Sequence, residues 1–540
     1  MLTLPVAAGA SVDRTSALHA YARARLADSD GASGLAVQSY RRAMAGDPDS
    51  RDIARRSYSH ALMSGDMALA LQSAALLDGD GILSRDGTLL FLCDAFNRAD
   101  WKAARHLTDR LTSEGNFGFL APIILSWISL AEGNYVPPTI DATDRFASLA
   151  RRYVDEHVAL QALAKGNLEE AASAINRALA LRTVDLATLR LSFAGQLARK
   201  GARKQALTLL PEGDADYARA REELQRGRRA SGAGTPLTAR QGYGRLLARL
   251  ATDISSDDST RVLAVRLARI AAFADPDSDD THIILAKLLT EGGYADYGVA
   301  EAQKIAADGW FGTLGQPALV DALTASGDRD GAIVLARTLA AAPDADAERH
   351  VQLGRLLAQA RQFSAAADAF RAAQARYAAD AVPWALMLFE GSALEQAGRW
   401  DEARAVLERA VKIAPDEAVL LNHLGYAQIE RRQNVEVALE LLKKASALKP
   451  DEPSITDSLG WAQFVTGDVE AAVPVLERAA EGAPADAAIN EHLGDALWTT
   501  GRRYEARYAW RAAAVFAEGD AALRLEAKTK EGLKPEYAAP

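Results

Sequence analysis

The chain has 540 residues, of which 49% are hydrophobic and 25% charged, and this mixture excludes a protein that is disordered throughout. One compact core rarely grows to this length, which favours several domains or one extended repeat array. The formal net charge of −10 makes nucleic acid a poor default partner. The single cysteine, Cys93, excludes a disulfide framework and a cysteine-based zinc site. No run of about 18 apolar residues occurs, so no transmembrane helix is predicted.

The chain begins with MLTLPVAAGASVD, in which Ala8-Gly9-Ala10 has the pattern of a signal-peptide cleavage site. The stretch before it is short and has no basic residues. We therefore keep two interpretations of residues 1–16, a frayed N-terminal tail or the remnant of a secretory signal.

Residues 17–210 carry a spacing of small and large side chains that we interpret as an array of degenerate helical repeats. Ala36, Tyr40, Ala43 and Pro48 stand at relative positions 0, 4, 7 and 12, and the beginning of this pattern recurs from Ala171. Residues 133–144, GNYVPPTIDATD, are predicted to be a loop inserted between helices. Residues 211–238 are rich in charged residues, glycine, serine and proline, and we predict a linker there.

Residues 239–517 are predicted to form a second array, in which the repeat is clearest from residue 350 onward. Counting from Gly460, Ala472 stands at +12, Leu476 at +16, Ala479 at +19 and Pro484 at +24. The pattern begins at five glycines: Gly354, Gly391, Gly425, Gly460 and Gly494. From Gly391 onward the intervals between them are 34, 35 and 34 residues. The longer interval places one extra residue in the turn RRQNVE.

This spacing has a physical explanation in a pair of antiparallel helices. The glycine and the alanines are small because the two helices cross closely there, and the large residue at +16 fills the space between them. Proline at +24 ends the second helix. One pair cannot bury its apolar face, so neighbouring pairs must stack. Residues 518–540 are predicted to form a capping helix and a tail.

The pattern resembles the tetratricopeptide repeat (TPR), whose own period is 34 residues. The resemblance implies an all-α TPR solenoid: antiparallel helix pairs in a right-handed superhelix, with about a dozen units, several of them degenerate. It also implies that the first helix of each pair lines the concave side of the superhelix.

One face of these first helices is the candidate binding site. Residues three before, one after and four after each glycine share that face, because their positions differ by four and then by three. We predict that a partner binds this strip, since exposed rows of large apolar groups are unusual and Trp and Tyr are frequent anchors. The alternative is that they pack against the neighbouring first helix and belong to the core. The predicted partner-binding residues are Asn422, Tyr426, Ile429, Asp457, Trp461, Phe464, Glu491, Asp495 and Trp498.

No catalytic chemistry is visible in the sequence. It lacks the motifs G-x-x-x-x-G-K-[ST], H-E-x-x-H and G-x-S-x-G. Its eight histidines are scattered, and we interpret His423 and His492 as packing or surface residues. We predict a protein that is not an enzyme, with no catalytic residues, metal site or cofactor, although dispersed catalytic residues stay an open alternative.

The last units, with LNHLGY, DSLGW and NEHLGDALW, are similar to the end of proteobacterial periplasmic TPR lipoproteins, some of which are adaptors of C-terminal processing proteases. The resemblance implies a scaffold that presents substrates to a periplasmic protease, and it favours the periplasm, with or without outer-membrane association, over the cytoplasm. The lipid-attachment cysteine of that group has no counterpart here. The alternative is a regulatory or substrate-binding TPR component of an enzyme, a secretion complex or a polysaccharide-export complex.

The charge of the strip restricts the kind of partner. TPR domains that clamp a C-terminal carboxylate use Lys, Arg and Asn on this face, whereas here the row is acidic and aromatic. We therefore predict a protein or peptide ligand with a basic or apolar segment, extended or helical.

Overall fold

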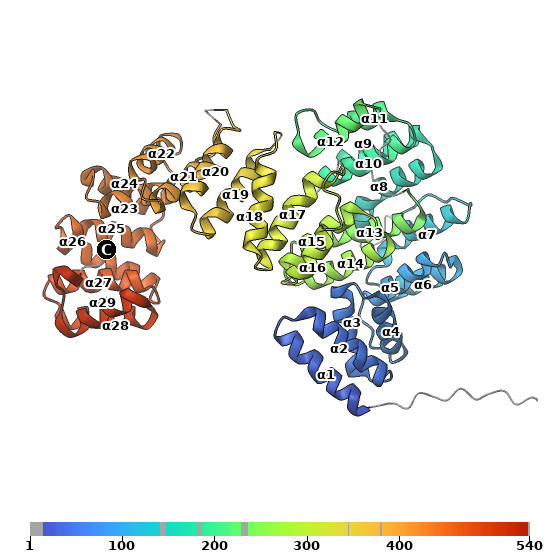
Figure 1. Ribbon diagram of the computed structural model, residues 1–540, viewed down its shortest axis with the longest axis horizontal. Coiled ribbons are helices and arrows are strands. Elements are labelled where there is room, and N and C mark those ends of the chain that lie inside the picture. The colour runs from blue at the N-terminus through green and yellow to red at the C-terminus, as the bar shows by residue number, and fades with distance from the viewer. Residues whose placement is uncertain are drawn as a thin grey trace, which may run out of the picture. The chain divides into compact units, whose positions relative to one another are not determined.

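The structure is a computed structural model that describes residues 14–140, 147–180, 186–227, 236–343, 345–378 and 381–537. Within these ranges every regular element is helical, with 29 α-helices, two short 3-10 helices and no β-strand (Figure 1). The predicted all-α class is therefore confirmed. Of the predicted N-terminal tail, residues 1–13 lie outside the described ranges. None of the described helices combines the length and the apolar character needed to cross a membrane.

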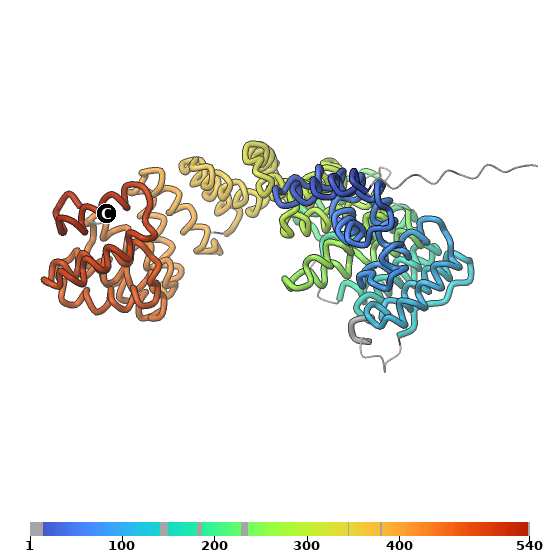
Figure 2. Tube along the Cα trace, turned by 90° about the horizontal axis from the view of Figure 1, so that it is seen from below, coloured from blue at the N-terminus to red at the C-terminus, as the bar shows by residue number. Residues whose placement is uncertain are grey.

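The chain divides into two compact units, Met1–Ala345 and Asp346–Pro540, which we call unit 1 and unit 2. In each unit consecutive helices pack against each other in antiparallel pairs, which can be followed along the trace in Figure 2.

Unit 1 contains the first eighteen α-helices. They are α1 (Arg14–Ser29), α2 (Ser33–Gly46), α3 (Arg51–Ser64), α4 (Met67–Gly79), α5 (Gly87–Asn97), α6 (Trp101–Glu114), η1 (Gly118–Leu120), α7 (Ala121–Ala131), α8 (Ala147–Lys165), α9 (Leu168–Ala180), α10 (Leu186–Arg199), α11 (Arg203–Leu209), α12 (Ala215–Gln225), α13 (Ala239–Ile254), α14 (Arg261–Ala274), α15 (Asp279–Glu291), α16 (Ala295–Ala302), α17 (Gly312–Ala325) and α18 (Arg329–Ala340).

Unit 1 is not a simple row of repeats, because α13 and α14 pack against the much earlier helices α3, α5, α7 and α8 (Figure 1). The hydroxyl of Tyr243 donates to the carbonyl oxygen of Leu89 at 2.7 Å. The guanidinium of Arg269 donates to the carbonyl oxygens of Leu62 and Met63 at 3.0 and 2.8 Å. These bonds hold α13 and α14 against the earlier helices α5 and α3, and the buried side chains of all four helices belong to one core.

The segment 211–238, predicted to be a linker, lies inside unit 1 rather than between units. Its helix α12 buries Tyr217 and Leu224, and the indole N–H of Trp310 donates to Glu223 at 2.6 Å. The buried residues Tyr217, Ala220 and Leu224 recur at intervals of three and four, so they share one face of α12 and pack, although the segment as a whole is charged. Residues 228–235 lie outside the described ranges. In the predicted insertion 133–144, the described part up to residue 140 contains no helix.

Unit 2 contains five helix pairs and a final helix. They are α19 (Ala347–Gln359), α20 (Phe363–Gln374), α21 (Trp384–Gln396), α22 (Trp400–Ile413), α23 (Ala418–Glu430), α24 (Val435–Leu448), α25 (Pro453–Val465), α26 (Val469–Gly482), α27 (Ala487–Thr499), α28 (Arg503–Phe516), α29 (Gly519–Glu531) and η2 (Pro535–Tyr537).

The glycines of unit 2 are places where the two helices of a pair touch. A Cβ atom on Gly460 would lie 2.7 Å from Cγ of Leu476, which is the large residue predicted to face it. On Gly494 the same atom would collide with the ring of Trp510. The predicted relation between the glycine and the residue at +16 is thus confirmed, and it explains why these positions exclude larger side chains.

The turns inside each pair need a left-handed backbone. Gly467 and Gly501 supply it with φ of 93° and 83°. Arg361 stands at the corresponding turn after α19 with φ of 57°, and the longer turn RRQNVE contains Arg432 and Asn434 with φ of 50° and 47°. The extra residue of that repeat therefore lies in the turn, as predicted.

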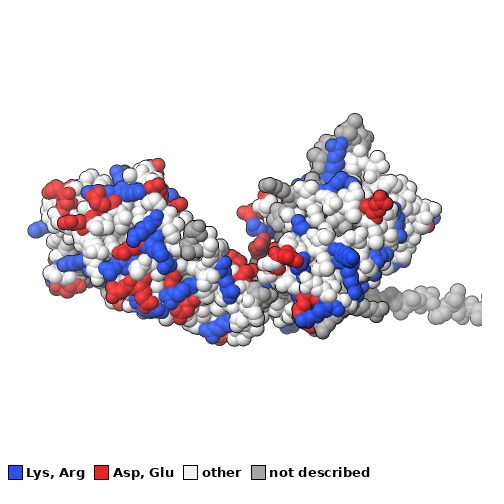
Figure 3. Space-filling view, turned by 90° about the horizontal axis from the view of Figure 1, so that it is seen from above, with Lys and Arg blue, Asp and Glu red and all other residues white. Residues whose placement is uncertain are grey.

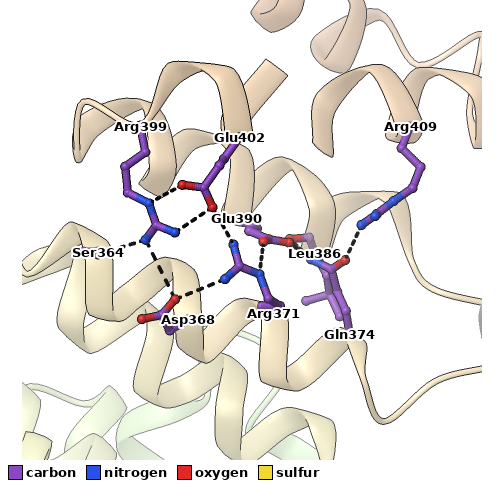
Figure 4. Close-up of polar contacts among 9 residues, drawn as sticks. All are labelled: Ser364, Asp368, Arg371, Gln374, Leu386, Glu390, Arg399, Glu402 and Arg409. Carbon is purple, nitrogen blue, oxygen red and sulfur yellow. Dashed lines mark hydrogen bonds and ion pairs between the residues drawn. The ribbon is translucent and has the colours of Figure 1, made fainter. Parts of the chain in front are cut away.

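Polar side chains join neighbouring repeats in unit 2. The carboxylate of Glu390 on α21 is buried, and it accepts hydrogen bonds from Arg371 at 2.8 Å and Gln374 at 2.7 Å, both on α20 (Figure 4). Arg399, just before α22, pairs with Glu402 and reaches Asp368 (Figure 4). On the face of unit 2 that Figure 3 shows, acidic and basic side chains are mixed without a large patch of one sign.

Candidate protein-binding site

The nine predicted partner-binding residues lie on three successive first helices, α23, α25 and α27, and side-chain packing connects them into one row. Tyr426 and Phe464 pack against the buried cluster that contains Ile429 and Trp461. Phe464 and Trp498 both pack against the next cluster, around Trp510. We call the nine residues the inner row.

Trp461 lies inside this row rather than on its surface. Its side chain is only 4% exposed. Its ring stacks on Phe464 at a centroid distance of 5.1 Å and on His492 at 4.1 Å, with interplanar angles of 21° and 15°. Ile429, the neighbour on α23, is fully buried in the same cluster. The structure therefore favours the packing alternative for these two residues, and partner binding through them stays a prediction.

The acidic members of the row already have partners within unit 2. Asp457 accepts a hydrogen bond from Nδ1 of His492 at 2.9 Å, so that nitrogen carries the proton. Glu491 binds Lys528 at 2.6 Å, and Asp495 binds the same ammonium group at 2.7 Å. All three carboxylates are buried. The acidic edge predicted to meet a basic partner is thus already hydrogen-bonded to a histidine and ion-paired with α29.

Two residues of the inner row have shifted pKa values. Burial alone would raise the pKa of Glu491, but hydrogen bonds from Arg524 and Lys528 outweigh burial and leave the pKa below its usual value. Burial raises the pKa of Tyr426, and the nearby negative charge of Glu430 adds to this effect. Glu491 is therefore a carboxylate at neutral pH, and Tyr426 keeps its hydroxyl proton.

Each of the three helices of the inner row has at least one partly accessible member. Asn422, Tyr426, Phe464 and Trp498 are half-buried. The side-chain oxygen Oδ1 of Asn422 is enclosed and has no hydrogen-bond partner among the described residues. A buried acceptor without a donor costs about 1–3 kcal/mol.

Trp498 is covered from two sides. The guanidinium groups of Arg503 and Arg507 lie 5.2 and 5.1 Å from the centre of its ring, within the range of cation–π attraction. Gly532, directly after α29, lies against the same ring, so closely that a Cβ atom would not fit.

The sequence prediction did not include Arg524 and Lys528, although a signal for them exists. Lys528 follows Gly494 by 34 residues, which is one further period of the repeat. Extending the count by one unit would have placed α29 beside α27 and its cations beside Glu491 and Asp495. His492, interpreted from the sequence as a packing or surface residue, is buried and stacks on Trp461.

Comparison with known families finds the tetratricopeptide repeat in unit 2. Two sequence profiles with this description match, one at residues 351–418 and 458–522 and the other at 394–460. A search of curated proteins finds no significant match.

Solved structures with a similar helix arrangement include MamA of strain AMB-1, at 23% identity and a TM-score of 0.27, covering 33% of this chain and 96% of that one. MamA from Desulfovibrio magneticus RS-1 has 15% identity and a TM-score of 0.29, with coverage of 32% and 94%. YrrB, described as a TPR protein with an unusual peptide-binding site, has 17% identity and a TM-score of 0.29, with coverage of 35% and 97%. Likeness at this level says nothing about the ligand of this chain.

Proposed function

This chain is an all-α solenoid whose residues 351–522 are tetratricopeptide repeats, and from that premise we propose that it is a non-enzymatic scaffold that binds a protein or peptide on the inner row of unit 2. The observation that carries the proposal is the set of half-buried side chains in the inner row, which leaves one amide and three aromatic rings partly accessible: Asn422, Tyr426, Phe464 and Trp498. Backbone N–H groups and apolar side chains of a peptide fit that combination.

Unit 1 is the less suitable half for the same task. The faces of α3, α5, α7 and α8 that would bind a partner are covered by α13 and α14 of the chain itself. Hydrogen bonds such as the one between Tyr243 and Leu89 fix these helices in place. A partner would have to replace a shared core there, whereas on unit 2 it meets side chains that are already half-exposed.

The specific role that we propose is presentation of substrates to a protease in the periplasm, through a basic or apolar segment of the partner. Its support is the similarity of the last repeats, DSLGW and NEHLGDALW, to periplasmic TPR lipoprotein adaptors. On the face of unit 2 that Figure 3 shows, the mixture of acidic and basic side chains supports selective side-chain contacts over general attraction of one sign of charge.

A photo-crosslinking amino acid at position 426, introduced in the native organism, tests the proposal. The matched control has the same amino acid in place of Tyr508, an aromatic residue on α28 that is 68% exposed. We expect the probe at 426 to capture a protein that the probe at 508 does not. Capture of a protease and its substrates supports the adaptor role, and capture of an export component or glycosyltransferase contradicts that role while keeping the scaffold. Identical captures at both positions contradict the scaffold site itself.

A further inference from the structure

Unit 1 contains a cleft of its own, separate from the inner row of unit 2. It is lined by residues of α5, α6, α7 and α8 and by the start of α13, and its volume is about 520 Å³. Clefts that hold small molecules usually measure about 300–1,000 Å³, so this one has room for a compact organic ligand.

The apolar surface of the cleft has a fixed floor and an accessible wall. Phe96 and Trp127 line the cleft and are almost completely buried. The indole N–H of Trp127 already donates to His157 at 2.9 Å. Trp101 packs edge-on against Phe96, with ring centroids 5.5 Å apart, and is only half-buried, as is Leu130. A ligand can therefore reach an indole ring and a leucine that are already held in place, which suits a flat apolar group.

The charged side chains that line the cleft are both basic, although the whole chain has a formal net charge of −10. They are Lys165 and Arg240, and no Asp or Glu is among the described residues that line it. The two cations are not equivalent. The Nζ atom of Lys165 lies 3.3 Å from the carboxylate of Glu170 and 3.8 Å from the centre of the Tyr135 ring, so its charge already has a partner.

Arg240 is the available cation. Its side chain is half-buried, and within the described part of the chain it has no hydrogen bond, ion pair or ring contact. It is the second residue of α13, so the partial positive charge at the start of that helix adds to the charge of the guanidinium. The positive potential of the cleft is therefore concentrated at Arg240.

From these features we infer that the cleft binds an organic monoanion, a carboxylate joined to a flat ring system. One available cation matches one negative charge, whereas a phosphate dianion would need a second cation that Lys165 does not supply. The planar fork of N–H donors on Arg240 matches the two oxygens of a carboxylate. The ring system lies against Trp101 and Leu130. The inference concerns unit 1 and does not depend on the function proposed for unit 2.

Calorimetric titration of the full-length chain with naphthylacetate tests the inference. We expect saturable binding with a Kd of about 1 mM or lower, which a ligand of this size reaches at ordinary efficiency. Naphthylacetamide has the same rings without the charge and should bind at least about tenfold more weakly, because the charge-assisted hydrogen bonds are lost. Acetate, which has the charge without the rings, should show no measurable binding.

Two substitutions locate the site. Arg240→Gln should weaken the binding of naphthylacetate at least about tenfold. Ala131→Trp should abolish it, because Ala131 is an exposed residue that lines the cleft and the larger side chain fills the space while Arg240 is kept. The matched control is Arg511→Gln, at an exposed arginine on α28 of unit 2, which should bind as the unaltered chain does.

The inference is overturned by any of three results: no saturable binding to the unaltered chain, equal affinity for the acid and the amide, or the same affinity in Arg240→Gln and Arg511→Gln. Circular dichroism shows whether each variant is folded. The comparison of acid with amide uses only the unaltered chain, so it decides between carboxylate recognition and simple apolar binding even where a variant does not fold.

Discussion

Replacing Trp461 with alanine is the sharpest test of how the inner row is built. Exposure of 4% and two stacked neighbours make this side chain part of the core of unit 2. A buried tryptophan removes about 150–250 Å² from water, which corresponds to roughly 4–6 kcal/mol as an upper value. Substitutions of this kind cost about 3–5 kcal/mol when the cavity does not collapse. We therefore expect Trp461→Ala to lower the free energy of unfolding of unit 2 by about 4 kcal/mol.

The measurement is urea unfolding of the full chain followed by far-ultraviolet circular dichroism, with attention to the transition of unit 2. The matched control is Tyr508→Ala, whose side chain is 68% exposed and which should cost less than about 0.5 kcal/mol. A loss below about 1 kcal/mol for Trp461→Ala would refute the packing interpretation, because a surface aromatic gives that value. The prediction that Trp461 binds a partner would then be favoured again.

Three further predictions concern other parts of the chain. Gly494→Ala should destabilise unit 2 by about 2 kcal/mol in urea unfolding, because its methyl group collides with the facing indole ring, whereas Gly34→Ala, where the structure leaves open space, should cost nothing. Arg361→Gly should raise stability by up to about 1 kcal/mol in the same assay, since the left-handed backbone at this turn penalises a side chain. Burial lowers the pKa of His157 to about 4, so the unfolded chain takes up this proton first as pH falls. The stability present above about pH 6.5 should be lost progressively down to about pH 4, by up to about 3 kcal/mol, and His157→Gln should lack that part of the pH dependence while still accepting the Trp127 N–H.

Local spacing in the sequence predicted the helix pairs of unit 2 well, because the fit between a glycine and the residue at +16 is a contact within one repeat. Gly460 and Leu476 illustrate this, and so does the extra residue in the turn at Arg432. Contacts of this kind recur, and recurrence is visible in a single sequence.

Contacts between segments far apart in the chain do not recur, so no pattern in the sequence predicted them. Arg269 binds carbonyl groups of α3 more than 200 residues earlier, a relation that occurs once and has no period. The charged segment around Glu223 was predicted to be a linker for the same reason, since its partner Trp310 lies 87 residues further on.

The helical spacing also did not predict whether the side chains of the inner row are exposed or buried. The periodicity places Trp461 on a shared face, but only the neighbouring helices determine whether that face is covered. His492 covers it from the next repeat, and Lys528 neutralises the adjacent acidic pair from the helix after that. Both contacts depend on how repeats stack, which the spacing within one repeat does not fix.

The bond between Arg269 and the end of α3 has a consequence during synthesis of the chain. Leu62 and Met63 leave the ribosome 207 and 206 residues before the arginine that binds them. At about 5–20 residues per second this interval lasts roughly 10 to 40 s. During that time the apolar faces of α3 to α8 have no α13 or α14 to cover them. Chaperones that hold nascent chains would therefore find their main target in the first half of this protein, before any repeat of unit 2 exists.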